Sequence, residues 1–223
     1  METFFHIAAL SACYGLLFLL TTWVSRKGSE SLLLVHQQKG NWQLLHVRHA
    51  GGIIIMVALP ALTIRELPTY LLALPSRISW TQVIVFNISV ALLVNLGIKN
   101  RPRLVDTIND DSSYIQNTNL HIALRSIFLI SYEWFFRGVL LFGCMSITGA
   151  ASAILINLVL YAFIHGVNGK REVLGSIPFG LLLCLLTIWC HSVWPAVVLH
   201  LILSFSYESS LLSTYLKKSK IIL

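Results

Sequence analysis

Charged side chains are scarce in this chain of 223 residues. Only 11% are Asp, Glu, Lys or Arg, whereas 56% are hydrophobic. A soluble domain of this length carries roughly 25% charged residues. The scarcity of charge excludes an ordinary soluble domain and predicts an integral, polytopic membrane protein, folded as a single domain over residues 1–223.

Common catalytic and redox motifs are also missing. No CxxC spacing occurs, and the four cysteines lie in or at the ends of apolar segments, so we expect packing residues without disulfides or a zinc knuckle. The chain has no HExxH of a zinc peptidase, no GxSxG nucleophile elbow and no glycine-rich phosphate loop. The apolar segments contain no pair of aspartates.

Long apolar runs are what the chain does contain. A bilayer core is crossed by about 20 apolar residues of helix, and seven runs qualify. They cover residues 4–24, 46–64, 81–98, 119–142, 150–166, 172–190 and 193–210. The polar stretch 109–119 between the third and fourth runs predicts a loop. The fold class is therefore predicted as an all-α membrane bundle of about seven transmembrane helices.

The basic residues outside these runs, together with Arg48 at the start of the second run, predict an orientation. Twelve of them fall on one side of the membrane: Arg26, Lys27, Lys39, Arg48, Lys99, Arg101, Arg103, Lys170, Arg171, Lys217, Lys218 and Lys220. Only Arg65 and Arg77 fall on the other side. By the positive-inside rule, the amino terminus lies outside and the carboxy terminus is cytoplasmic.

Three of the apolar runs contain polar pairs spaced four residues apart. The pairs are Glu133 with Arg137, Tyr161 with His165, and His200 with Ser204. Residues four apart share a helix face. A charge at the bilayer centre costs at least about 2.5–3.5 kcal/mol, so these side chains are expected to face a common interior. The other histidines, including His49 and His121, are assigned to helix ends or loops.

One buried carboxylate, two histidines and an arginine indicate activation of water. A carboxylate in a low dielectric has a raised proton affinity and can serve as a general base near neutral pH. Imidazoles and small hydroxyl groups can stabilise the oxyanion formed when water attacks a carbonyl. The set predicts peptide hydrolysis within the membrane.

The same residues carry a family resemblance. SYEWFFRG resembles the first motif, EExxxR followed by Gly, of the CAAX-processing and bacteriocin-processing (CPBP, or Abi) intramembrane proteases. YAFIH resembles the second motif, FxxxH, and HSVWPAVVLHLILS resembles the region leading into the third, HxxxN. The resemblance covers about residues 119–210. It implies a glutamate-dependent endopeptidase that acts on a membrane-embedded or lipidated protein or peptide.

The chain departs from the family pattern at three positions. Tyr132 stands where the motif has its first Glu, leaving a reduced ExxxR form, Tyr161 replaces the Phe, and Ser204 replaces the Asn. By resemblance, Glu133 would then activate water, and His165 would hold or relay the proton. His200, aided by Ser204, would stabilise the oxyanion. Arg137 would fix the Glu133 rotamer, and Tyr132 would support the site by packing.

Other interpretations of these residues stay open. Glu133 and Arg137 could be a structural ion pair, His165 a helix cap, His200 a hydrogen-bonded core histidine, and Ser204 a residue bonded to its own helix.

Three expectations concern function as a whole. No cofactor or metal is expected, although Glu133, His165 and His200 also have ligand chemistry suited to zinc. A degenerate relative that binds a partner, such as an immunity protein, is the non-enzymatic alternative. We expect the protein to lie in a lipid bilayer, most simply the inner membrane of a bacterium. We expect no nucleic-acid partner.

Overall fold

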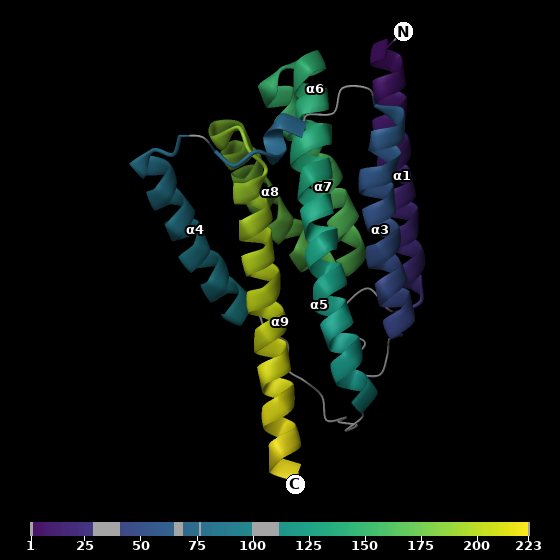
Figure 1. Ribbon diagram of the computed structural model, residues 1–223, viewed down its shortest axis with the longest axis vertical. Coiled ribbons are helices and arrows are strands. Elements are labelled where there is room, and N and C mark those ends of the chain that lie inside the picture. Colours follow the sequence, from purple (N-terminus) through teal and green to yellow (C-terminus); the bar gives the residue numbers. More distant parts are fainter. Residues whose placement is uncertain (1, 29–40, 65–68, 76, 100–111, 223) are drawn as a thin grey trace.

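The computed structural model describes residues 2–28, 41–64, 69–75, 77–99 and 112–222, with the side chains of 2–6, 69–70, 112–117 and 211–222 left aside. Every regular element in these ranges is helical, which confirms the predicted all-α class (Figure 1). The long helices are α1 (Glu2–Arg26), α3 (Trp42–Thr63), α4 (Trp80–Lys99), α5 (Ser112–Glu133), α6 (Leu141–Thr148), α7 (Ala150–His165), α8 (Lys170–Cys190) and α9 (Trp194–Ile222). Shorter segments are the 3-10 turns η1 (Thr69–Leu72) and η3 (Gly166–Asn168), and the π-helix η2 (Trp134–Leu140).

Among the residues that the structure describes, six segments are long and apolar enough to cross a bilayer. They correspond to the first six predicted spans, with ends that differ by a few residues, and the fourth runs through α5, η2 and α6 as Thr118–Thr148. The seventh predicted span, 193–210, coincides with the start of α9. Its crossing of the bilayer stays a prediction, as do the orientation and the single domain.

The fourth segment forms the centre of the bundle. In its apolar 18-residue stretch 72% of the residues are buried, whereas the share in the other candidate spans does not exceed 33%. In Figure 1, α1 and α3 lie on one side of α5, and α4, α8 and α9 lie on the other. Direct contacts join α5 to α3 and to α9. The motif-bearing helix is therefore surrounded by protein, where buried polar side chains can find partners.

The predicted loop at 109–119 is wrong from Ser112 onward, because α5 begins there; residues 109–111 lie outside the described residues. Thr118 and His121 are 9% and 2% exposed and pack into the bundle. Tertiary packing overrides the weak helix propensity of this polar stretch.

Candidate functional site

The site is built around a change of helix type. Glu133 is the last residue of α5, and Arg137 lies inside the π-helix η2 that follows. Both side chains are 0% exposed, and Arg137 Nη1 lies 3.2 Å from Glu133 Oε2. Short π-helical stretches are rare and occur frequently at functional sites. Here the π-helix begins directly after the acid and contains its arginine partner.

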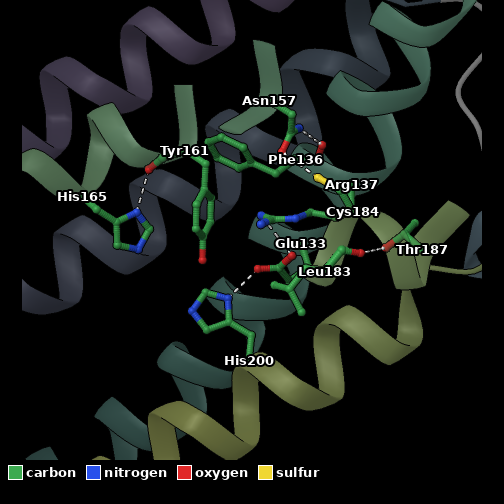
Figure 2. Close-up of polar contacts among 10 residues, drawn as sticks. All are labelled: Glu133, Phe136, Arg137, Asn157, Tyr161, His165, Leu183, Cys184, Thr187 and His200. Atoms are coloured by element: carbon green, nitrogen blue, oxygen red, sulfur yellow. Dashed lines mark hydrogen bonds and ion pairs between the residues drawn. The ribbon is translucent and has the colours of Figure 1, made fainter. Parts of the chain in front are cut away.

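His200 brings α9 to the same carboxylate. Its Nδ1–H donates to Glu133 Oε1 (Figure 2). The ring of Phe179 packs edge-on against the imidazole, with the ring centroids 5.4 Å apart. Both oxygens of Glu133 thus face a partner, His200 on one side and Arg137 on the other. The predicted convergence of the fourth and seventh runs is present as a direct hydrogen bond.

Aromatic packing accommodates the Arg137 guanidinium. It lies over the ring of Tyr161 at 4.1 Å, a cation–π geometry that offsets part of its desolvation. Gly180 of α8 allows this close approach. A Cβ there would lie 3.0 Å from Tyr161 Cδ1 and 3.4 Å from Arg137 Nη2.

Two residues that the sequence analysis did not select fix the π-helix. Asn157 Nδ2 donates to the carbonyl of Phe136 at 2.6 Å, and Cys184 Sγ donates to Asn157 Oδ1 at 3.4 Å. These bonds tie η2 to α7 and α8 (Figure 2). A signal was present: Asn157 interrupts the apolar run of α7 four residues before Tyr161, on the face that carries the site.

His165 lies farther away than predicted. Its Nδ1 bonds the carbonyl of Tyr161 at 2.7 Å, and the side chain is only partly buried. In Figure 2, Tyr161 stands between His165 and the Glu133–His200 pair. The structure therefore brings His200 to Glu133 directly, whereas His165 approaches through aromatic rings.

Tyr132 fills the space between the two histidines. Its ring lies 5.9 Å from that of His200 and 6.4 Å from that of His165, both edge-on, and stacks on Phe136 at 4.5 Å. Tyr132 is 5% exposed, and its hydroxyl has no hydrogen-bond partner among the side chains described.

Ser204 belongs to a different set of contacts. It accepts from Arg125 Nε at 3.2 Å and donates to Glu208 Oε1 at 3.3 Å. His49 and His121, which the sequence assigned to helix ends or loops, are also in the interior, at 1% and 2% exposed. That assignment was wrong because both histidines lie two turns inside their helices, facing α5 or α3.

Within the described ranges, no three His, Cys, Asp or Glu side chains are grouped as metal ligands. The chemistry available is that of an ion-paired carboxylate hydrogen-bonded to an imidazole, next to a second, more accessible imidazole.

Comparison with known proteins agrees with the motifs. Residues 120–206 match the family model described as type II CAAX prenyl endopeptidase Rce1-like. No curated protein and no solved structure matches the chain. The family supports a CAAX-type intramembrane protease, a hydrolase with a membrane-associated protein substrate. Residues 120–206, which carry every residue of the site, therefore belong to the CAAX protease (CPBP) family, as the three motifs predicted.

Proposed function

We propose that this protein is an intramembrane endopeptidase that hydrolyses a peptide bond of a lipidated or membrane-embedded protein by glutamate-dependent activation of water. One observation carries the proposal: the continuous chain from Arg137 through Glu133 to His200, buried at the junction of α5, η2 and α9. A structural ion pair needs only the first two members. The imidazole adds a group that can accept and donate a proton.

The two nitrogens of His200 suggest how the acid acts. With Nδ1–H donating to Glu133, the neutral imidazole carries its lone pair on Nε2. Nε2 takes a proton from water while the water oxygen bonds to the substrate carbonyl carbon, and the C=O π bond breaks to leave an oxyanion. Glu133 stabilises the resulting imidazolium, as carboxylates do in other acid–histidine pairs. The carboxylate thus activates water through His200, whereas the motif resemblance implied direct contact.

We propose that His165 handles the proton on the leaving-group side of the reaction. Because its Nδ1 is engaged with the Tyr161 carbonyl, its Nε2 is the free acceptor. A nitrogen with a lone pair has no proton with which to bind an oxyanion. It can instead take up the proton released by water, through a bridging water molecule, and deliver it to the amine nitrogen as the C–N bond breaks and the oxyanion re-forms a carbonyl. Tyr132 packs between the two imidazoles and keeps them apart. The oxyanion role of Ser204 stays a prediction, since its described bonds are to Arg125 and Glu208.

An apolar groove of about 740 Å³ is lined in part by Gly166, the residue that follows His165. It is formed by α1, α7 and α8, and its lining includes Phe18, Phe163, Gly166 and Ile177. We propose that it receives the apolar part of the substrate, either a lipid chain or a hydrophobic segment. In this proposal the protein lies in a bacterial inner membrane with its carboxy terminus in the cytoplasm, as the sequence predicted. The hydrolysis it carries out requires no metal ion.

The test is hydrolysis by the purified protein in liposomes. Candidate peptides ending in a CAAX box, with and without a prenyl chain, are incubated with the protein, and products are identified by mass spectrometry. We expect cleavage by the parent protein and by His191→Ala, whose side chain is exposed at the end of α8. We expect no cleavage by Glu133→Gln. Chelator treatment and metal analysis of the same sample test the zinc alternative, which predicts loss of activity on chelation.

A catalytically degenerate, partner-binding relative is the second candidate. Tyr132 in the first-Glu position favours it. The discriminating variant is Tyr132→Glu: if it creates activity that the natural protein lacks on every peptide tested, the natural protein is a pseudoenzyme.

A further inference from the structure

A second buried polar cluster lies between α3, α5 and α9, apart from the site already described. It consists of His49, His121, Arg125, Ser204 and Glu208. Four of these residues are 1–8% exposed, and the Arg125 side chain is 22% exposed. Ionisable residues inside a membrane protein are costly, and they commonly face water-filled cavities or mark substrate and ion pathways.

Part of the cluster is internally paired. Glu208 Oε1 lies 3.5 Å from Arg125 Nε, and Glu208 Oε2 lies 3.6 Å from His121 Nε2. Ser204 bridges Arg125 and Glu208 through its hydroxyl. These contacts connect α5 and α9.

The imidazoles supply the second observation. The rings of His49 and His121 lie 5.3 Å apart, yet neither ring nitrogen of His49, nor Nδ1 of His121, bonds to any part of the chain that the structure describes. A buried polar group left without a partner costs about 1–3 kcal/mol. Sites with several convergent polar atoms are those where ordered water satisfies such groups.

The cluster is continuous with the proposed catalytic pair. His200, Ser204 and Glu208 are spaced four apart on α9 and share one face. On α5, Arg125 precedes Glu133 by eight residues, about 12 Å along the axis. The polar stripe thus runs from the acid–base pair toward the end of the bundle where α5 begins, shown at the lower end of Figure 1.

We propose that this stripe lines the route by which water reaches His200 and Glu133. The inference rests on the proposed function: each hydrolysed peptide bond consumes one water molecule, and the hydrocarbon core supplies almost none. Ser204, Glu208 and the two histidines provide the hydrogen-bonding partners along the way. Arg125, the most exposed member, stands at the entrance.

Cysteine accessibility tests the route without requiring catalysis. In a background with Cys13, Cys144 and Cys190 changed to Ala and Cys184→Ser, single cysteines are introduced as Ser204→Cys and His121→Cys. Val198→Cys is the matched control, because Val198 lies on α9 and is 36% exposed on the outer surface of the bundle. Lys99→Cys, at the exposed end of α4, is the aqueous control. The probe is a cationic methanethiosulfonate applied to both faces of proteoliposomes.

Only a hydrated thiol ionises and attacks the reagent sulfur, forming a mixed disulfide and releasing sulfinate. We expect Ser204→Cys and His121→Cys to react at least tenfold faster than Val198→Cys. If both react no faster than Val198→Cys while the variants keep the background's melting temperature, the cluster is a dry ion-pair clamp and the route is overturned. His49→Cys replaces either variant that fails to fold.

The two proposals fail separately. If Ser204→Cys is labelled but the parent protein cleaves no peptide, the hydrated route is supported and the proposed function is contradicted. Cleavage by the parent protein, with no labelling at either position, would overturn the route alone.

Discussion

The Nδ1–H of His200 on α9 donates to Oε1 of Glu133 on α5, so two helices that begin some 80 residues apart meet through an acid–base pair. The other carboxylate oxygen faces Arg137 at 3.2 Å. The pair therefore has both a structural and a chemical consequence, and these can be separated by mutation.

The structural consequence concerns the buried charge. Glu133→Gln leaves the fully buried Arg137 without its counter-charge, so we expect the free energy of unfolding to fall by about 3–5 kcal/mol. The double variant Glu133→Gln/Arg137→Met removes both charges and should recover most of this loss, yet remain inactive. Thermal unfolding in detergent measures the first effect and peptide cleavage the second. A single variant as stable as the parent would contradict the ion pair.

Gly180 provides a test of the packing around Arg137. In Gly180→Ala the new Cβ would press on Leu158 and Tyr161 at 3.0 Å, so we expect a destabilisation of about 1–3 kcal/mol and reduced cleavage. The matched control is Gly175→Ala on the same helix, where no atom lies within 4 Å. This exchange should be neutral or stabilise by about 0.5–1 kcal/mol, because alanine is the better helix former. Equal melting temperatures for the two variants would argue against the close approach of α8.

The π-helix depends on Asn157. Asn157→Leu removes the donor to the Phe136 carbonyl, and we expect a loss of about 1–3 kcal/mol in stability together with a fall in kcat of at least about tenfold. Asn87→Leu is the control, since Asn87 is exposed and bonds only the carbonyl of Val83 in its own helix. Undiminished cleavage by Asn157→Leu would show that the π-helix is not needed for catalysis.

Tyr132→Phe separates packing from chemistry at the degenerate motif position. The hydroxyl is buried and unpaired in the described structure, so its removal should keep or raise stability and leave the cleavage rate within about threefold. A loss of 100-fold or more would mean that the phenol takes part in the reaction.

The sequence was sufficient to predict the helices and to predict that two residues of the first motif lie side by side. Apolar length predicted the spans, and four-residue spacing placed Glu133 with Arg137 on one face. The loop at 112–119 was mispredicted because local composition does not reveal that Thr118 and His121 are buried against other helices.

The rest of the site depends on packing that spacing alone does not determine. The π-helix arises from bonds to Asn157 on another helix, and a regular α-helical wheel cannot anticipate it. The separation of His165 from Glu133 results from the bulk of Tyr132 and Tyr161, whose rings lie 5.8 Å apart between them. The second cluster was missed because its partners, His49, His121 and Glu208, lie in three distant segments.

A double-mutant cycle on peptide cleavage tests the central claim most directly. The rates of the parent, Glu133→Gln, His200→Ala and the double variant are measured on one lipidated peptide at saturating concentration. If Glu133 acts through His200, each single variant should lose at least about 100-fold in kcat, and the double variant should be no slower than the slower single one. Near-parental activity in either single variant, or losses that multiply in the double variant, would contradict the account.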